Sequence, residues 1–150
     1  MVEYKNPGHT VIIIIESKEN GKLVLTKRGI DPFKGHLLFP GGFVEYEETV
    51  EHAAERESME EAGVKIKLKE ILGVYSKPDR DPRGHNISTV FIAEALNDNV
   101  KAGDDAEEAF LAKPEEIDVS KLGFDHPQIF KDYLVWKKKK GTYWSGKSKD

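Results

Sequence analysis

Residues 42–64 read GFVEYEETVEHAAERESMEEAGV, and this is the most informative stretch of the sequence because it predicts a long helix with a clear end. Between Thr49 and Ala62 it contains neither glycine nor proline, and residues that favour helices dominate. Gly63 follows directly, at the position where a C-cap glycine is expected. The sequence therefore predicts a helix of about four turns that ends at Gly63.

One face of this helix carries small or apolar side chains, and a neighbouring face carries acids. Because an α-helix turns by about 100° per residue, positions four apart form a ridge that can lie against a sheet. The residues of this ridge are Val50, Ala54, Ser58 and Ala62. Glu57, Glu60 and Glu61 share one face beside the ridge, because they are three and four positions apart. Glu51 and Glu55 fall on a different face.

The acidic face is a candidate metal site. Three like charges on one face repel one another and raise each other's pKa unless a positive charge lies among them. Carboxylate oxygens are ligands that suit Mg²⁺ or Mn²⁺. Arg56, beside the acids, could orient a carboxylate or contact a phosphate, and Gly41 and Gly42 let the backbone approach closely. The alternative is a solvated charged face, the usual state of acid-rich helices.

The acids and glycines also follow a defined spacing. Written with x for the intervening residues, the spacing is Gly42-x5-Glu48-x7-Arg56-Glu57-x2-Glu60-Glu61-x-Gly63-Val64. This pattern resembles the signature of the Nudix hydrolases. Ser58, a packing position, departs from it because an aliphatic residue is usual there.

The resemblance implies a fold, a reaction and several roles. The fold is α+β, a Nudix-type α/β/α sandwich with a mixed β-sheet. The reaction is Mg²⁺-dependent hydrolysis of a nucleoside diphosphate linked to a second group, with Mn²⁺ as the other candidate metal. By the same resemblance, Glu57, Glu60 and Glu61 bind metal. The Gly41 carbonyl adds a ligand, and Arg56 steadies the carboxylates.

The remainder of the chain alternates strand patterns with loops. Strands are predicted at Thr10–Ile15, Lys22–Lys27, Lys69–Tyr75 and Ile87–Leu96. The first two form a hairpin around the Asn20-Gly21 turn. Residues 28–42 are expected to form an ordered loop with a short strand, and residues 97–107 a loop before the apolar piece at 109–112. A closing C-terminal helix is predicted from the spacing of Phe130, Tyr133, Leu134 and Trp136.

The composition fits a single domain over residues 1–150, with 38% hydrophobic and 33% charged positions. A formal charge of -4 gives no global case for nucleic-acid binding. No apolar run is long enough to span a bilayer and no signal segment opens the chain, so we expect no membrane partner and a cytoplasmic location. The chain has no cysteine, which excludes thiolate chemistry. Residues 137–150 are expected to form a basic, solvated or frayed tail.

Several stretches outside residues 42–64 are similar to the ADP-ribose pyrophosphatase branch of the Nudix family. They include DPFKGHLLFPGGFVE, LGVYSKPDRDPRGHNISTVF, GDDAEEA and FDHPQIFKDYL. His36 with the Leu37-Leu38 pair, and Leu111 in place of a frequent tryptophan, depart from that branch. The similarity implies hydrolysis of ADP-ribose to AMP and ribose 5-phosphate.

Two alternatives stay open beside this hypothesis. The first keeps the chemistry and changes the substrate to other nucleoside diphosphate sugars or to oxidised nucleoside triphosphates. The second is a sensor that binds ADP-ribose without cleaving it. A sensor usually has an eroded acidic cluster or an attached DNA-binding domain, and we expect neither in this chain.

Substrate contacts are expected from arginine and aromatic side chains. Arg28, Arg80 and Arg83 are candidates to hold the diphosphate or a terminal phosphate, because guanidinium groups match phosphate oxygens. Phe33 and Tyr75 could stack on a base. The alternatives are exposed loop arginines and aromatic residues of the core.

The acidic residues Asp104–Glu108 are a candidate source of a general base. Such a loop is usually only solvated, but similar loops in the family often supply a carboxylate to the metals or a base. We favour Glu108, with Glu107 second. The other candidates are Glu60 and a hydroxide on the metal.

The histidines identify no further catalytic group. His-x-x-x-His and Ser/His/Asp arrangements are lacking among the histidines, which are therefore expected to be structural or exposed: His9, His36, His52, His85 and His126. His85 has the best chance of touching the substrate. The family resemblance and the apolar N-terminal segment favour a homodimer.

Overall fold

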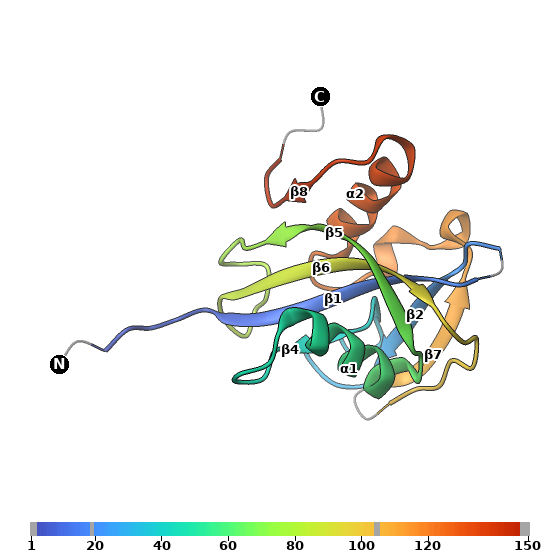
Figure 1. Ribbon diagram of the computed structural model, residues 1–150. Helices are drawn as coiled ribbons and strands as arrows, with labels where there is room; N and C mark the ends of the chain where they lie inside the picture. The colour runs from blue at the N-terminus through green and yellow to red at the C-terminus, as the bar shows by residue number, and fades with distance from the viewer. Residues whose placement is uncertain (1–2, 19, 104–105, 148–150) are drawn as a thin grey trace.

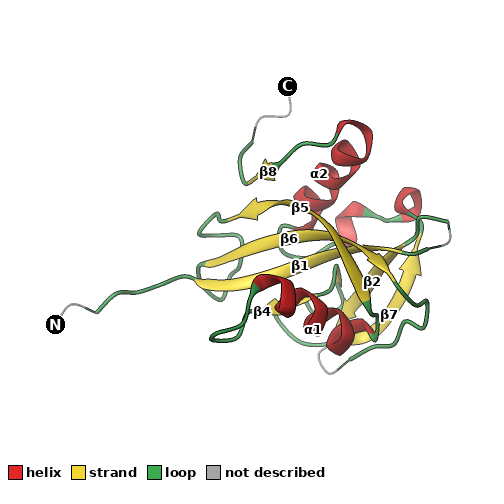
Figure 2. Ribbon diagram, in the orientation of Figure 1, coloured by secondary structure: helices red, strands yellow, loops and turns green. Residues whose placement is uncertain are grey.

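The structure is a computed structural model that describes residues 3–18, 20–103 and 106–147. Its strands are β1 (Gly8–Glu16), β2 (Leu23–Arg28), β3 (Leu37–Leu38), β4 (Gly41–Phe43), β5 (Ile66–Tyr75), β6 (Asn86–Ala95), β7 (Ala106–Ala112) and β8 (Tyr143–Trp144). Within these ranges the helices are α1 (Val50–Ala62), α2 (His126–Lys139) and the short 3₁₀ segments Pro114–Glu116 and Val119–Lys121. Figures 1 and 2 show α1 and α2 on opposite faces of the twisted strands.

All described strands belong to one mixed sheet. The strand order is β3-β2-β1-β6-β5-β8, with β4 paired to β1 and β7 paired to β2. β1 runs parallel to β6 and β5 runs parallel to β8, whereas the other pairs are antiparallel. A mixed sheet with helices on both faces is the predicted α/β/α sandwich, and that prediction is confirmed.

β1 lies at the centre of the sandwich because both of its faces are buried. Val11, Ile13 and Ile15 belong to the apolar cluster that includes the alanines of α1. Ile12 and Ile14 belong to the cluster on the other face, which includes the aromatic residues of α2. A strand covered on both sides requires an uninterrupted apolar run, and each fully buried isoleucine contributes about 1.5–3 kcal/mol.

Helix α1 begins and ends at the residues that the sequence predicts. The Thr49 hydroxyl accepts a hydrogen bond of 3.0 Å from the backbone N–H of His52 and caps the N-terminus. Gly63 ends the helix in the left-handed conformation, with φ of 67°, and its N–H donates to the carbonyl of Met59. Both caps satisfy backbone groups that would otherwise lack a partner.

The predicted small-residue ridge of α1 packs against the sheet. Ala54, Ser58 and Ala62 are fully buried, and Val50 packs at the edge of the same cluster. The hydroxyl of Ser58 donates a hydrogen bond of 2.8 Å to the carbonyl of Ala54. The polar atom that replaces an aliphatic side chain therefore has a partner inside the helix.

β1 and β2 diverge along their length. At one end of β1, Glu16 lies opposite Leu23 of β2. At the other end, Thr10–Ile12 pairs instead with Gly41–Phe43 of β4, while β2 pairs with β3 and β7. The gap between the diverging strands is thus occupied by β4, which brings Gly42 next to Glu57 of α1.

The predicted loop at residues 97–107 ends earlier in the structure. Residues from Ala106 to Ala112 form β7, so Glu107 and Glu108 lie in a strand that pairs with β2 rather than in a loop. Backbone pairing with β2 outweighs the low strand propensity of adjacent glutamates. Asp104 and Asp105 of the predicted acidic loop lie outside the described residues.

The predicted tail at residues 137–150 is also partly folded. Lys137–Lys139 form the last turn of α2, and Tyr143–Trp144 form β8 beside β5. Tyr143 is 4% exposed and packs with the α2 side of the core, which explains why a segment with four consecutive lysines still contains ordered structure. Residues 148–150 lie outside the described part of the chain.

A buried carboxylate ties the sheet to α2. Glu16 at the end of β1 is 7% exposed. It accepts hydrogen bonds from Lys69 Nζ of β5 at 2.8 Å, and from Tyr133 Oη and Lys137 Nζ of α2 at 2.6 and 3.0 Å. Burial raises the pKa of Glu16, but the three donors outweigh burial, and the pKa lies below its ordinary value of 4.5.

We expect Glu16→Gln to destabilise the fold most strongly near neutral pH. Because the folded-state pKa of Glu16 is depressed, its contribution is present above pH 4.5 and is lost as the pH falls through the folded-state pKa. The free energy of unfolding at pH 7 should fall by about 1–3 kcal/mol. The gap in stability between pH 7 and pH 3 should shrink, as urea denaturation at both pH values would show.

The exposed Glu70 of β5 provides the matched control. Glu70→Gln should change the free energy of unfolding by less than about 0.5 kcal/mol. An unchanged pH dependence in Glu16→Gln would contradict the assigned role of the buried carboxylate.

Candidate active site

A cavity of about 460 Å³ lies between β1, β2, β4, α1 and the start of α2. This volume is typical of small-molecule sites. Its acidic lining residues are Glu45, Glu57, Glu60, Glu61 and Asp81. Its basic lining residues are Arg28 of β2 and Arg80 and Arg83 of the β5–β6 connection, together with Arg56. Carboxylates and guanidinium groups in one cavity suit a ligand that combines a metal ion with phosphate groups.

Glu57 reaches this cavity because a glycine lies opposite it. Glu57 is 8% exposed, and a Cβ atom on Gly42 would lie 2.4 Å from its carboxylate carbon. Only glycine therefore allows β4 and this carboxylate to lie so close together. The pKa of Glu57 is raised, first by burial and further by the charge of Glu60, although the Arg56 guanidinium acts in the opposite direction.

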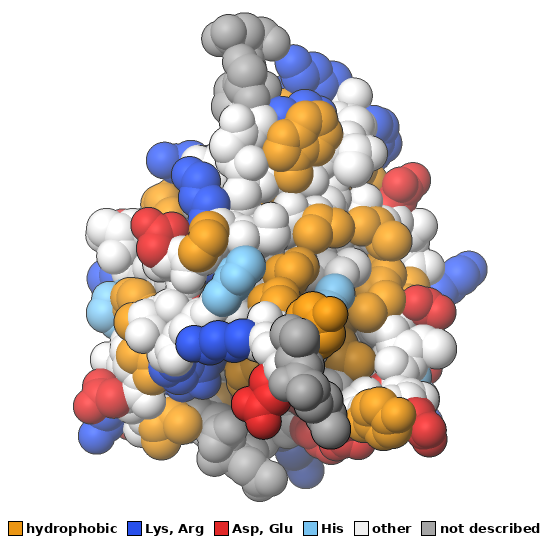
Figure 3. Space-filling view, turned by 90° about the vertical axis from the view of Figure 1, so that its left-hand side faces the viewer, with side chains coloured by type: hydrophobic (Ala, Val, Ile, Leu, Met, Phe, Trp, Pro, Cys, Tyr) orange, Lys and Arg blue, Asp and Glu red, His pale blue; other side chains and the backbone are white. Residues whose placement is uncertain are grey.

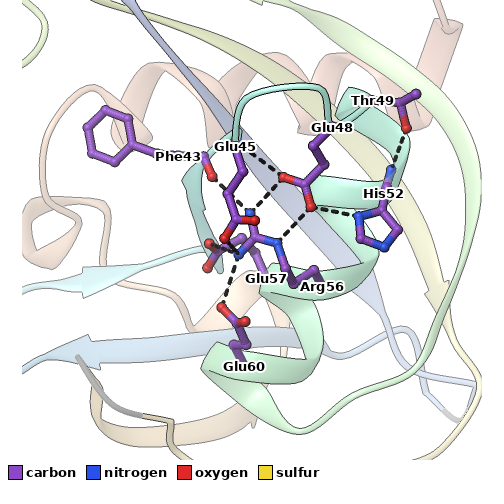
Figure 4. A network of polar contacts seen from close by, with 8 residues as sticks. All are labelled: Phe43, Glu45, Glu48, Thr49, His52, Arg56, Glu57 and Glu60. Atoms are coloured by element: carbon purple, nitrogen blue, oxygen red, sulfur yellow. Dashed lines mark hydrogen bonds and ion pairs between the residues drawn. The ribbon is translucent and has the colours of Figure 1, made fainter.

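Arg56 links three glutamates and a strand (Figure 4). Nε and Nη2 donate to the two carboxylate oxygens of Glu48 at 2.7 and 2.8 Å. Nη1 donates to Glu57 at 2.8 Å and to Glu60 at 3.1 Å. Nη2 also donates to the carbonyl of Phe43 at 2.9 Å. All five N–H groups of the guanidinium are thus in use, so this arrangement orients carboxylates rather than contacting a phosphate.

Glu48 is the main partner of Arg56. The Arg56 guanidinium holds the pKa of the Glu48 carboxyl well below its usual range, and the N–H of Glu45 contributes in the same direction. His52 Nδ1 lies 2.6 Å from Glu48 Oε2. These contacts hold Glu48 as a charged acceptor behind Arg56, and they raise the pKa of Arg56 further above its ordinary value.

The residues present fit a divalent metal ion. Three carboxylates from consecutive turns of α1 line one cavity, and hard cations prefer such oxygen donors. In the part of the chain that the structure describes, no three Asp, Glu or His side chains converge closely enough to hold an ion. Arg56 Nη1 engages one oxygen each of Glu57 and Glu60. The second oxygen of each carboxylate would bind the ion.

The three arginines predicted to bind phosphate all line the cavity, but they differ in exposure. The Arg80 side chain is 6% exposed, and its Nε and Nη2 bind both oxygens of Asp125 at 2.8 and 2.7 Å. The Arg83 side chain is 44% exposed, and Nη2 lies 2.8 Å from Asp81 Oδ2. Arg83 and Arg28 are therefore better placed than the buried Arg80 to reach a phosphate.

Two aromatic side chains that the sequence analysis did not select, Phe43 and Phe124, line the cavity. The guanidinium carbon of Arg83 lies 5.7 Å from the ring centroid of Phe43 and 5.5 Å from that of Phe124. Arg28 lies 5.3 Å from the centroid of Phe124. Phe33 does not belong to the lining and packs on Phe124, with ring centroids 4.5 Å apart. Phe33 would therefore act on a base through Phe124.

Tyr75 is a core residue rather than one that could stack on a base. Its side chain is 1% exposed, and its hydroxyl donates a hydrogen bond of 2.6 Å to Asp132 of α2. Burial and the Asp132 carboxylate raise the pKa of Tyr75 well above its ordinary value. Tyr75 thus joins β5 to α2 and does not line the cavity.

The two candidate general bases lie in different places. Glu60 lines the cavity, whereas Glu108 is an exposed residue of β7 outside the lining. Glu107 is also exposed, and its carboxylate lies 3.7 Å from Lys27 Nζ. The role of Glu108 as a base stays a prediction, and Glu60 is the candidate that this structure places in the cavity.

The surface near the N-terminal segment carries charges of both signs. Figure 3 shows basic, acidic and hydrophobic side chains intermingled on this side, without one continuous basic area. None of the described helices has the length and apolar character needed to cross a membrane. This side of the surface therefore shows no basic area that would suit a nucleic acid.

The fold and the acidic cavity define the class of this protein. The family model of the NUDIX domain matches residues 6–133, and the chain belongs to the Nudix family of hydrolases. An ADP-ribose pyrophosphatase of Methanocaldococcus jannaschii is 53% identical over 134 residues, which make up 89% of this chain and 77% of that protein. Nudix ADP-ribose pyrophosphatases generally need a divalent metal ion, in agreement with the donors on α1.

Two further similarities bear on the site. The "ADPR responsive transcriptional repressor NtrR" of Acinetobacter baylyi is 26% identical over 149 residues, which cover 94% of this chain. The chain spans 58% of the length of that repressor. The crystal structure of a NUDIX hydrolase from Nitrosomonas europaea matches with a TM-score of 0.81 and 28% identity, over 96% of this chain and 80% of that one.

We expect Gly42→Ala to displace the Glu57 carboxylate, because the new Cβ would lie 2.4 Å from it. A shift of about 1 Å in such a group costs on the order of 10²-fold in rate. Steady-state hydrolysis across a range of metal concentrations would show a lower kcat and a weaker response to metal.

Gly21→Ala is the matched control. Gly21 lies in the turn between β1 and β2, its surroundings are open, and it does not line the cavity. This variant should lose some stability, because its φ of 62° disfavours alanine, and it should keep its activity. Wild-type kinetics in Gly42→Ala would contradict the placement of Glu57.

Proposed function

We propose that this Nudix hydrolase cleaves ADP-ribose to AMP and ribose 5-phosphate with Mg²⁺. The observation that carries the proposal is the cavity in which carboxylates of α1 and the arginines of β2 and the β5–β6 connection meet. Such a cavity suits a diphosphate with an associated cation. The similarity to the Methanocaldococcus jannaschii enzyme, whose name gives ADP-ribose as its substrate, supports this choice.

The reaction adds water across the P–O–P bond of the substrate. The water oxygen bonds to one phosphorus, the bond from that phosphorus to the bridging oxygen breaks, and this oxygen stays with the other phosphate. A divalent ion, when bound, polarises the phosphate oxygens and stabilises the charge that develops on the departing group. The products are therefore two monophosphates.

The residues of this chain divide the remaining tasks. Glu57, Glu60 and Glu61 hold the ion, with the Gly41 carbonyl as a further ligand. Arg56 positions Glu57 and Glu60 through the hydrogen bonds of Nη1.

The substrate is held by the basic side of the cavity. Arg28 and Arg83 bind the diphosphate, and Arg80 supports this side through its bidentate contact with Asp125. Phe33 supports the aromatic surface of Phe124.

The proposed acceptor for the proton of the attacking water is a carboxylate. Glu60 lies in the cavity and can accept it, and Glu108 is the second candidate. Glu108 would have to move with β7 to reach the substrate, because it lies outside the cavity lining.

Mg²⁺ is the proposed ion rather than Mn²⁺, because a site with few protein carboxylates, completed by substrate phosphates, is typical of Mg²⁺.

We also propose a homodimer, since residues 3–7 extend away from the sheet and Tyr4 is 81% exposed (Figure 1). Light scattering would then give about twice the chain mass of 16.9 kDa. The expected cytoplasmic location stays a prediction, which cell fractionation would test.

Product analysis tests the substrate. With ADP-ribose and Mg²⁺, we expect equal amounts of AMP and ribose 5-phosphate, measured by ion-exchange chromatography. Release of pyrophosphate from oxidised nucleoside triphosphates, or faster cleavage of other nucleoside diphosphate sugars, would favour the alternative substrates. Tight binding of ADP-ribose without any product would favour a sensor. This alternative is tested because the similar repressor is named as responsive to ADPR.

Substitution of the α1 acids tests the metal site and the base together. Glu60→Gln and Glu61→Gln should each lower kcat by about 10²- to 10³-fold, because each removes a charge that stabilises the transition state. Glu108→Gln should lower kcat comparably only if Glu108 is the base.

The exposed Glu55, on another face of α1, supplies the matched control. Glu55→Gln should leave kcat close to that of the wild type. Near-normal turnover of Glu60→Gln with saturating Mg²⁺ would refute the metal-ligand assignment.

A further inference from the structure

His126 occupies the first position of α2 and is 5% exposed. Its Nδ1 accepts a hydrogen bond of 3.1 Å from the backbone N–H of Phe39, in the segment between β3 and β4. A backbone N–H can only donate, so Nδ1 must be unprotonated. The proton of the neutral ring is therefore carried by Nε2.

The surroundings of His126 fix both the orientation and the charge of its ring. The ring stacks on Phe39, with centroids 5.7 Å apart and planes 16° apart. Burial lowers the pKa of His126 to about 4; the charge of Asp125 raises it, and that of Arg80 lowers it. The ring is thus neutral at physiological pH and holds one tautomer.

The Nε2–H group faces the cavity. Within the described part of the chain, His126 makes no hydrogen bond through Nε2. Yet Nε2 is not among the buried atoms that lack a partner, because His36 Nδ1 is the one such side-chain atom in the described residues. Nε2 is consequently accessible rather than buried without a partner. Since His126 belongs to the lining of the cavity, this access is to the cavity.

The chemistry around Nε2 indicates which part of a ligand it meets. The carboxylates and arginines of the cavity already provide for a metal ion and for phosphates. His126 instead lies beside the aromatic ring of Phe124, with centroids 6.3 Å apart. A donor beside an aromatic surface matches a hydroxyl or a ring nitrogen of a nucleoside, because the base is the part of a nucleotide that packs on aromatic rings.

We propose that His126 Nε2–H donates a hydrogen bond to an uncharged acceptor of the bound nucleotide and so determines substrate specificity. This inference rests on the proposed function, because it assigns a contact to the substrate of the same cavity. The contact positions the substrate and takes no part in proton transfer. Its strength should be independent of pH between about 5.5 and 8, since the ring does not titrate there.

A pair of substitutions separates the contact from the structural bond to Phe39. In His126→Asn, the Oδ1 atom can still accept the Phe39 N–H, but no donor reaches the cavity. In His126→Gln, the amide nitrogen can occupy the place of Nε2. We expect His126→Asn to raise KM for ADP-ribose about 3- to 10-fold with kcat little changed, and His126→Gln to restore KM.

Thermal unfolding of both variants completes this comparison. If His126 were only structural, KM would change together with thermal stability. His126→Asn would then keep the wild-type KM and stability, whereas His126→Gln would have a raised KM and a lower stability. That outcome would overturn the proposal. An unchanged KM in His126→Asn would overturn it as well.

A binding measurement on the wild-type protein does not depend on folding of the variants. In a spectrum of ¹⁵N-histidine protein, His126 should show a proton on Nε2 from pH 5.5 to 8. Saturation with α,β-methylene ADP-ribose should shift that signal and slow its exchange with water, whereas inorganic phosphate should not. Absence of any shift at saturation would overturn the proposal.

The same titration distinguishes failure of the inference from failure of the proposed function. Titrations with AMP and with ribose 5-phosphate identify which half of the substrate carries the acceptor. A shift with AMP, in a wild-type protein that does not hydrolyse ADP-ribose, would refute the proposed substrate and keep the His126 contact. Turnover of ADP-ribose without any change in the Nε2 signal would support the proposed substrate and refute the His126 contact.

Discussion

The guanidinium of Arg56 is the group on which the rest of the site depends. It joins Glu48 before α1, Glu57 and Glu60 within α1, and the Phe43 carbonyl of β4. A half-buried arginine is stable only when its donors are satisfied, and here all five are. The same bonds orient the carboxylates of the cavity. One side chain thus connects the packing of helix against strand with the placement of the cavity's carboxylates.

The position of the cavity follows from the sheet. β1 and β2 pair at one end and diverge toward the other, where β1 pairs with β4 instead. This divergence places Gly42 against Glu57 and leaves room for Arg28 on the far strand. The start of α2 adds Phe124 and His126. A charged cavity therefore forms where β1, β2, β4, α1 and the start of α2 meet.

Local patterns were sufficient for several elements. The caps of α1 at Thr49 and Gly63 and the buried run of β1 act over a few residues, so their signals are visible in one stretch of sequence. The edges of β7 and the strand at Tyr143–Trp144 were not predictable in this way. They form because a distant strand supplies the backbone hydrogen bonds, and adjacent glutamates or a lysine run give no hint of that partner.

The reaction class followed from the spacing of residues 42–64, which resembles the Nudix signature, whereas helical periodicity showed only that Glu57, Glu60 and Glu61 share one face. Only the tertiary structure decided which other side chains reach those acids. It brought Phe124 and His126 into the cavity and left Phe33 outside its lining, although all three lie far from α1 in the chain. Contacts between distant segments depend on how whole elements pack, and no local spacing encodes them.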